Sequence, residues 1–531
     1  MKKRIYSILT TLLIGGILFY FMLPPINLSA PSFWIFLIIM LTIYFTVYSI
    51  YNAKEISDNF KYNKAEASKK VGIISISIIS VFLLISLINI INSPLFNAKS
   101  YYNRIAINED NSFEEDVKPV DFKSLPLLDK DSSRKLGDRV MGQMTELVSQ
   151  FRVSDLYTQI NFNDDIIRVT PLEYANVIKY FTNRKNGVKG YITLNSVTGK
   201  AELKKLDKGM KYMPSALFNE DLVRKLRFMY PTEIFDQISF EIDNEGNPYW
   251  IVPTIKYTGV GLRRDIKNLI IFNPVTGEGT KYDLKDVPSW VDHVYPSDLI
   301  IEQVNDWGLY EKGFLNSIFG QKGVVATTTG YNYIAMNDDI YLYTGVTSVS
   351  SDESNIGFIL TNLRTKETHF YEVSGAEEYS AMASAEGQVQ QMKYKSTFPL
   401  LINLNNKPTY LMSLKDNAGL VKMYAFVDVV DYQNVVVTDA KHGIEVAAKN
   451  YLGNDINTVG EEFTEDIIIS KINTSVIDGT SYYYLTDTKN NKYKVSIKVE
   501  QSIIPFIEVG NKLNVSYTEN NSIREIIKIN K

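Results

Sequence analysis

Three long apolar runs in the first hundred residues constrain the fold more than any other feature. The runs cover residues 5–23, 32–51 and 71–91, and no charged residue lies inside any of them. A helix needs about 20 residues to cross roughly 30 Å of hydrocarbon, and a buried helix of a soluble protein rarely stays uncharged for that length. We therefore predict that residues 1–96 form an anchor of three transmembrane helices.

Positive charges around these runs predict how the anchor is oriented. Lys2, Lys3 and Arg4 precede the first run, the loop 24–31 carries no charge, and the loop 52–70 carries five lysines. Lysine and arginine collect on the cytoplasmic side of a membrane. We expect a multi-pass protein of the cell membrane with a cytoplasmic N-terminus and an extracytoplasmic part that begins near residue 97. If the first run is instead a cleaved signal peptide, the later part still lies outside.

Composition removes several kinds of chemistry. The chain has 531 residues, no cysteine, three histidines and a formal net charge of -4. Without cysteine there are no disulfides, no cysteine-ligated metals and no thiol catalysis, and the net charge gives no general attraction to nucleic acid. The three histidines stand far apart and outside any metal-binding motif. We predict no catalytic residue, no metal and no cofactor.

Two segments follow the anchor. Residues 97–129 are acidic and lack apolar periodicity, which favours an extended stalk. Apolar residues then recur at helical spacing. We predict one packed amphipathic helix, with Asp131 or Ser132 as its N-cap and Leu136, Val140, Met144, Leu147, Val148 and Phe151 on its apolar face.

A short motif then occurs three times. Apolar strands lead into Asn-x-x-Thr followed by Gly or Lys, with the asparagines at positions 195, 273 and 362, and a second strand follows each motif. Asparagine bonds its own backbone in tight turns and glycine supplies a positive φ, so each copy predicts a hairpin. Lys366 replaces the glycine in the third copy, and we expect that turn to differ.

The surroundings of the motif also recur. Residues 167–174 resemble residues 250–257, and a predicted helix at 219–229 precedes the second copy. Helix, strand and hairpin together indicate an α+β unit with an antiparallel sheet. We assign residues 130–290 to repeats one and two, and residues 291–450 to a third repeat with an aromatic-rich connecting region.

This pattern resembles PepSY-type modules, which occur in secreted and membrane-attached bacterial proteins. The matching segments are 192–199 and 270–277, with a weaker match at 358–366. The resemblance implies a noncatalytic role, either in regulating an enzyme or in binding an envelope partner. The whole chain also resembles multi-pass membrane proteins of low-GC Gram-positive bacteria, and this likeness implies no activity.

The pattern of residues 455–531 predicts a separate small β domain. Five alternating segments separated by turn residues resemble an OB-fold or a similar small barrel, a class that binds oligonucleotides or oligosaccharides. An extracytoplasmic location argues against nucleic acid.

Six aromatic residues are candidates for partner binding, although aromatic side chains more commonly pack in cores. They are Trp290, Tyr295, Trp307 and Tyr310 in the connecting region and Tyr482 and Tyr483 in the predicted barrel.

The predicted fold class is therefore a membrane-anchored α+β protein with three N-terminal transmembrane helices, repeated helix/antiparallel-sheet modules and a C-terminal small β-barrel. We expect a noncatalytic binding or regulatory protein of the bacterial cell envelope. Its expected partners are the membrane and an envelope protein, with wall polysaccharide as a further candidate and no nucleic acid. Two alternatives stay open: an envelope hydrolase that acts on wall polymers through Asp and Glu residues, and a scaffold subunit of a membrane complex.

Overall fold

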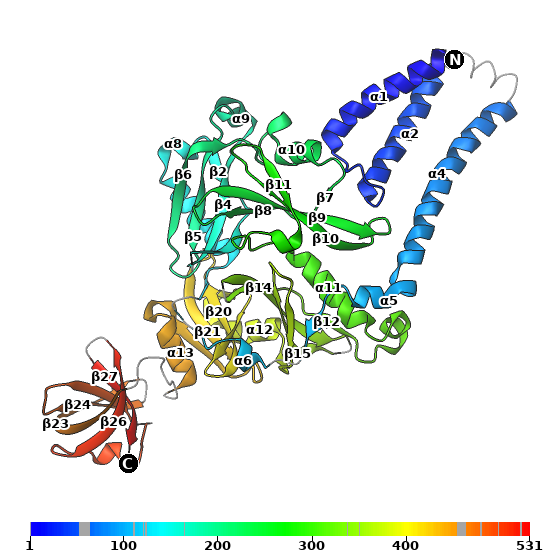
Figure 1. Ribbon diagram of the computed structural model, residues 1–531. Coiled ribbons are helices and arrows are strands. Elements are labelled where there is room, and N and C mark those ends of the chain that lie inside the picture. The colour runs from blue at the N-terminus through cyan, green and yellow to red at the C-terminus, as the bar shows by residue number, and fades with distance from the viewer. Residues whose placement is uncertain are drawn as a thin grey trace. The chain divides into compact units, whose positions relative to one another are not determined.

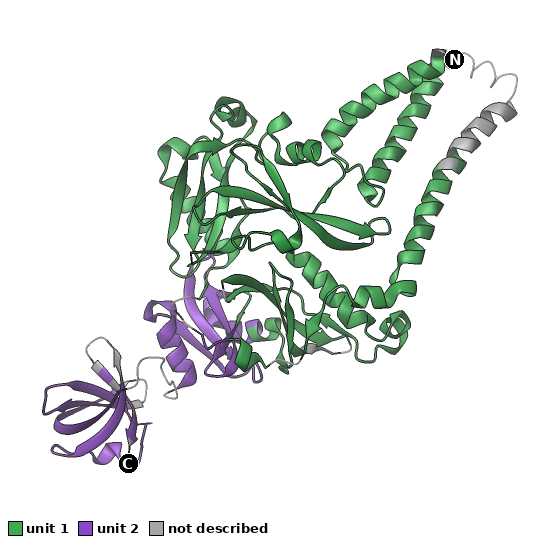
Figure 2. Cartoon of the chain, in the orientation of Figure 1, with its two compact units in different colours: residues 1–117, 123–381, 397–401 green, residues 118–122, 382–396, 402–531 purple. Residues whose placement is uncertain are grey.

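The computed structural model describes residues 2–51, 64–109, 112–120, 122, 125–163, 165–336, 338–349, 351–453, 463–477, 480–497, 499–520 and 523–530. The chain divides into two compact units (Figure 2). The first comprises residues 1–117, 123–381 and 397–401, and the second comprises residues 118–122, 382–396 and 402–531.

Long helices form the N-terminal part of the first unit (Figure 1): α1 Lys2–Met22, α2 Pro31–Tyr51, α4 Lys64–Asn92 and α5 Pro94–Tyr102. The stretches Lys3–Met22 and Pro31–Tyr51 are long and apolar enough to cross a membrane. The stretch Ile78–Asn92 of α4 meets the same test only together with α5, from which it is bent by 49°. Residues 52–63, with two of the lysines used to predict orientation, lie outside the described part of the chain.

Four sheets with one topology follow in the described part of the chain. In each sheet, two short strands lie along the same edge and pair with successive parts of one long strand. Two further strands then continue the sheet in antiparallel order. The first has β2 Phe151–Val153, β3 Thr158–Phe162, β4 Asp165–Tyr174, β5 Val188–Asn195 and β6 Ala201–Met210. The second has β7 Ile234–Phe235, β8 Ser239–Ile242, β9 Pro248–Thr258, β10 Arg263–Phe272 and β11 Gly279–Tyr282.

The third and fourth sheets repeat this order. The third has β12 Val325–Thr327, β13 Asn332–Met336, β14 Asp339–Ser348, β15 Ser351–Asn362 and β16 Thr368–Tyr371, extended by β1 Ile107–Asn108 and β17 Gly375–Ala376. The fourth has β18 Lys395–Ser396, β19 Leu400–Leu404, β20 Lys407–Lys415, β21 Val421–Asp428 and β22 Val435–Asp439.

A helix precedes each sheet in the sequence, and we call each helix with its sheet a module. The preceding helices are α7 Lys130–Gly142 with the short α8 Thr145–Val148, α10 Leu222–Met229, α11 Ser297–Tyr310 and α12 Glu378–Gln388. The remaining helices are α6 Phe113–Asp116, α9 Val177–Asn183 and α13 Ile444–Leu452. The first two modules share one core, in which Ile192 of the first sheet lies with Trp250 and Phe272 of the second.

The three predicted hairpin turns have the same hydrogen bonds. The side chains of Asn195, Asn273 and Asn362 each accept from the second and third following amides at 2.8–3.0 Å. The fifth residue has φ of +73° at Gly199, +78° at Gly277 and +69° at Lys366. The expectation that the Lys366 turn differs is therefore wrong, because the lysine adopts the left-handed conformation that glycine has in the sister turns.

Three further expectations need correction. Residues 97–109 and 112–117 do not form an extended stalk: they contain most of α5, β1, which pairs with β16, and the buried Phe113. The predicted helix after residue 130 is shorter, since α7 ends at Gly142 and Phe151 starts β2; its N-cap is Asp129, which accepts from the amide of Ser132 at 3.0 Å. Residues 291–450 hold two modules rather than one.

The C-terminal strands of the second unit close into a barrel. They are β23 Phe463–Ile477, β24 Thr480–Asp487, β25 Lys492–Ser496, β26 Lys512–Asn520 and β27 Ile523–Asn530. Ile467, Leu485, Val495 and Val515 lie in its interior. The predicted domain boundary at residue 455 lies outside the described residues.

Candidate functional site

The helices at the N-terminus do not end in free linkers, because their ends are bonded to the modules. The contacts involve α1, α4 and α5 on one side and α10, the β9–β10 hairpin and α11 on the other. We call this set of contacts the anchor junction.

Two arginines of α10 bind the carboxyl end of α1. Arg224 Nε donates to the carbonyl of Tyr20 at 3.0 Å, and Arg227 Nε donates to the carbonyl of Leu23 at 3.0 Å. The last carbonyls of a helix have no partner within the helix and carry the negative end of its dipole, so a cation there is stabilising. Burial lowers the pKa of Arg227 to about 10, which leaves it charged at neutral pH.

The loop between α1 and α2 and the end of α4 bind the second module. The amide of Ile26 donates to the carbonyl of Pro231 at 2.7 Å, and the amide of Gly261 donates to the carbonyl of Ser29 at 3.0 Å. Asn89 of α4 makes two bonds with Val260: its Nδ2 donates to the carbonyl at 3.1 Å, and its Oδ1 accepts from the amide at 2.8 Å. The tip of the β9–β10 hairpin is therefore bonded both to the α1–α2 loop and to α4.

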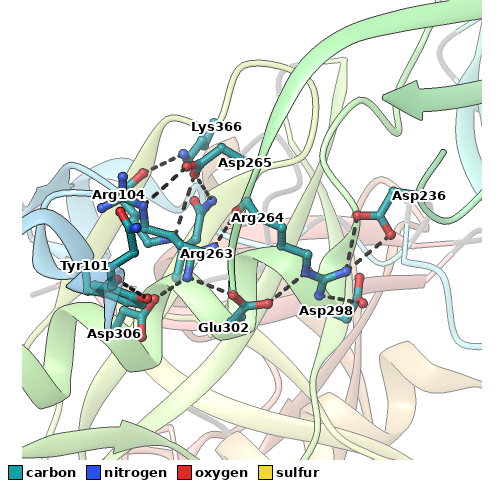
Figure 3. Close-up of polar contacts among 12 residues, drawn as sticks. Tyr101, Arg104, Asp236, Arg263, Arg264, Asp265, Asp298, Glu302, Asp306 and Lys366 are labelled. Carbon is teal, nitrogen blue, oxygen red and sulfur yellow. Dashed lines mark hydrogen bonds and ion pairs between the residues drawn. The ribbon is translucent and has the colours of Figure 1, made fainter. Parts of the chain in front are cut away.

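A network of charges continues from this hairpin, with Arg104 buried and Asp298 half exposed (Figure 3). Arg104, which follows α5, has Glu302 Oε1 at 2.8 Å and also binds Asp306, both on α11. Arg264 of β10 has Glu302 Oε2 at 2.8 Å, Asp298 at 2.8 Å and Asp236 at 3.2 Å. Glu302 thus bridges the two guanidinium groups with its two oxygens.

The electrostatics of the network follow from its burial. Burial raises the pKa of Asp306 to about 6 despite Arg104 beside it. For Arg104, burial alone would lower the pKa, but Asp306 and Glu302 raise it. Lys366, whose ammonium donates to the carbonyl of Arg104 at 2.6 Å, has a pKa lowered by burial. Each of the four carboxylates, Asp236, Asp298, Glu302 and Asp306, lies beside at least one guanidinium group.

A second buried cluster joins the first two modules to the segment that precedes α11. Glu241 of β8 accepts from the amides of Asp292 at 2.9 Å and His293 at 3.1 Å, while the Asp292 carboxylate accepts from the amide of Asn161 at 2.7 Å. Glu241 is 0% exposed and Asp292 is 2% exposed. Burial raises the pKa of Glu241, and burial together with the Glu241 charge raises the pKa of Asp292. The ring of His293 binds the carbonyl of Gln159 at 2.7 Å.

Both acids of this pair are buried. A surface cavity of the second module is lined by Asn268, Lys281, Tyr282, Asp283 and Asp286. Within the described residues, no group of three or more His, Asp or Glu side chains is arranged to hold a metal ion.

The predicted aromatic residues are dispersed. Trp290 packs on Tyr249 of the second module, with ring centroids 5.2 Å apart. Trp307 packs on Phe370 of the third sheet at 6.0 Å. These two are half-buried in module cores.

Tyr295 and Tyr310 lie beside the anchor junction. The ammonium of Lys366 is 5.7 Å from the Tyr295 ring centroid, and Tyr310 meets Tyr101 of α5 at 5.8 Å. In the barrel, Tyr483 packs against the interior while Tyr482 stacks with Lys494. The four candidates of the connecting region therefore pack on separate neighbours.

Sequence reasoning missed the charges of the anchor junction. Arg104 fell in the segment interpreted as a stalk, and Arg224, Arg264 and Asp306 matched no motif. Asn89 was visible as one of the few polar residues in the third apolar run, and that interruption was a usable signal.

Fold and site together define an α+β protein of several sheets with two N-terminal helices that could span a membrane. No protein-family model and no curated protein matches the chain. Similar solved structures include Trypanosoma rangeli sialidase with the inhibitor DANA, at 11% identity, a TM-score of 0.16 and coverage of 71% of this chain and 54% of that one. A mutant of that sialidase displaying trans-sialidase activity has 8% identity, a TM-score of 0.17 and coverage of 71% and 53%. The chain spans about half the length of these sialidases, and at such scores the likeness carries no argument about fold or activity.

Proposed function

We propose that this chain is a noncatalytic binding or regulatory protein of the bacterial cell envelope, which holds PepSY-like modules at a fixed position beside the membrane. The anchor junction is the observation that carries the proposal. A flexible linker would be enough to attach a domain to a membrane, whereas here α1, the α1–α2 loop and α4 each bind the second module. A module held in this way can meet only a partner that lies in or close to the same membrane.

The contacts also support the predicted orientation and the third crossing. Several large apolar side chains of α4 are more than half exposed, including Ile79, Phe82 and Leu83, and an uncovered apolar helix of this length suits a bilayer. With three crossings, the α1–α2 loop, the end of α4 and the modules all lie on one side. The loop without charges makes that side extracytoplasmic.

The repeated fold supports the PepSY-like assignment, since each module is a helix followed by an antiparallel sheet whose last hairpin carries an Asx-type turn. The closed five-stranded barrel is in keeping with an OB-like domain, for which wall polysaccharide is a candidate ligand. The hydrolase alternative is less favoured, because Glu241 and Asp292 are buried and their carboxylates accept hydrogen bonds from backbone amides.

Capture of the full-length chain after crosslinking in intact cells tests the proposal. The matched control is the anchor alone, residues 1–102, expressed at the same level. We expect an envelope protein that is recovered only when the modules are present and that captures this chain in the reciprocal experiment.

Two results would contradict the proposal. Recovery of the same proteins by the anchor alone would favour a scaffold. Release of soluble fragments from purified cell wall by the full-length chain, abolished by Asp292→Asn, would favour the hydrolase.

A further inference from the structure

An exposed apolar surface lies on the first two modules next to the end of α1. Its members are at least half exposed and come from α9, the short 3-10 helix Phe218–Glu220 and α10. They are Val177, Ile178, Phe181, Phe218 and Phe228, and we call them the apolar patch.

The patch is continuous with the membrane helix. The Phe228 ring contacts Phe19 and Tyr20 of α1, with centroids 6.1 Å and 6.2 Å apart, and Asn219 accepts from the Tyr20 hydroxyl at 3.2 Å. Further out, Phe181 meets Phe218 at 6.2 Å. The patch therefore touches α1 through Phe228, while the Phe181–Phe218 pair adjoins Asn219, which bonds to Tyr20 of α1.

The contact with α1 also sets the depth of the patch. Phe19 lies three residues before the end of α1 at Met22, which at about 1.5 Å per residue is roughly 4.5 Å along the helix axis. In a bilayer crossed by α1, Phe228 therefore lies near the level where α1 leaves the hydrocarbon. Interfacial helices bury their apolar faces about 5–10 Å into this boundary.

Basic side chains border the patch. Lys179 lies on α9 and Lys225 on α10, and Arg224 stacks over the ring of Tyr20 with its guanidinium 4.4 Å from the centroid. An apolar surface bordered by lysine and arginine is typical of elements that lie in the headgroup region of an anionic bilayer.

We propose that the apolar patch is a monotopic membrane contact, inserted into the leaflet from which α1 emerges, with anionic phospholipid as its ligand. This contact fixes the tilt of the modules over the bilayer, in addition to the bonds of the anchor junction. It does not depend on the partner or on the regulatory role proposed above.

Because the chain has no cysteine, single cysteines can be introduced without a background. Full-length Ile178→Cys and Phe181→Cys carry an environment-sensitive fluorophore in nanodiscs of phosphatidylglycerol and phosphatidylethanolamine, and nitroxide lipids serve as quenchers. Phe21→Cys in α1 is the positive control. Val148→Cys in α8, exposed but far from α1 in Figure 1, is the negative control.

We expect lipid nitroxides to quench the labels at 178 and 181 at least half as strongly as the label at 21, and to leave the label at 148 unquenched. Lys179→Glu should weaken quenching at 178 in anionic nanodiscs. Equal quenching at 178 and 148, whether strong or absent, would overturn the proposal. Because all four labelled positions are exposed, the variants should fold, and an unchanged thermal transition checks this.

Discussion

Lys366 has a left-handed backbone conformation in the third turn, and this conformation should lower the free energy of unfolding relative to a glycine at the same position. The two sister turns, which have glycine there, allow the size of this loss to be measured. For a residue with a side chain this conformation costs roughly 1–2 kcal/mol. Lys366→Ala and Lys366→Gly both lose the hydrogen bond from the ammonium to the Arg104 carbonyl, so that loss cancels when the two variants are compared. Only the alanine keeps the strain, and we expect it to be less stable than the glycine variant by about 1 kcal/mol.

The sister turns provide matched controls. A Cβ at Gly199 would lie 3.5 Å from a Leu128 methyl group, an ordinary contact, so Gly199→Ala should cost the same 1 kcal/mol or so from strain alone. At Gly277 a Cβ would overlap the ring of Tyr212. Gly277→Ala should therefore add the cost of overpacking, about 1–3 kcal/mol, to the strain.

Thermal unfolding of the full-length chain in detergent measures these differences. A loss of 1 kcal/mol lowers the Tm of a cooperative unit of 150–250 residues by about 2–4 °C. Trp307 packs on Phe370 in the same sheet as the Lys366 turn, so its fluorescence reports on the third module. If Lys366→Ala unfolds at the same temperature as Lys366→Gly, the strain argument is refuted.

Three further predictions concern the anchor junction. Arg104→Met leaves the largely buried Asp306 without its cation and takes from Glu302 one of its two guanidinium partners, Arg264 being the other; it should cost about 3–5 kcal/mol in unfolding, more than Arg104→Lys, and a loss below 1 kcal/mol would contradict this. Asp306 has a folded pKa of about 6 against 3.8, so the fold favours its protonated form, and stability should fall as pH rises from about 4 to 6, by up to about 3 kcal/mol. Asp306→Asn should remove that slope in unfolding curves at pH 4 and pH 7. Asn89→Ala removes both bonds to Val260 and should speed hydrogen exchange of the Val260 amide, and unchanged exchange would show that the hairpin is held by other contacts.

The repeated turns were predictable because their signal is local. An asparagine that bonds the next amides works through residues adjacent in sequence, so the pattern predicts a hairpin wherever it occurs. The fourth module was not predicted, because Asp428 takes the place of the turn asparagine and a longer loop follows it. Asp428 accepts from the amides of Val430 at 2.8 Å and Asp431 at 3.0 Å, which is the same chemistry without the Thr-Gly signature.

Helix length and side-chain direction were less predictable, because tertiary packing decides them. Apolar periodicity continued from Leu136 to Phe151, yet Phe151 belongs to β2, where it pairs with Tyr174 of β4. At the end of a helical pattern, a single apolar residue such as Phe151 fits both the 3.6-residue period of a helix and the start of a short strand. The partner-binding role of the aromatic residues could not be predicted for a related reason. Aromatic content alone does not say which neighbour a ring packs against.

The anchor junction could not be predicted because its charges come together only through folding. Arg104 and Asp306 are 202 residues apart in sequence and Arg104 and Glu302 are 198 apart, and each alone looks like an ordinary solvated side chain. Burying one of them without the others would cost several kcal/mol, so the group is stable only as a set. The set forms because α5 packs along α11, where Tyr101 meets Tyr310, and this packing places a cation from the end of the anchor between two acids of a module helix. The apolar runs predict that a membrane holds the chain, and the paired charges join the end of α5 to α11 of the third module.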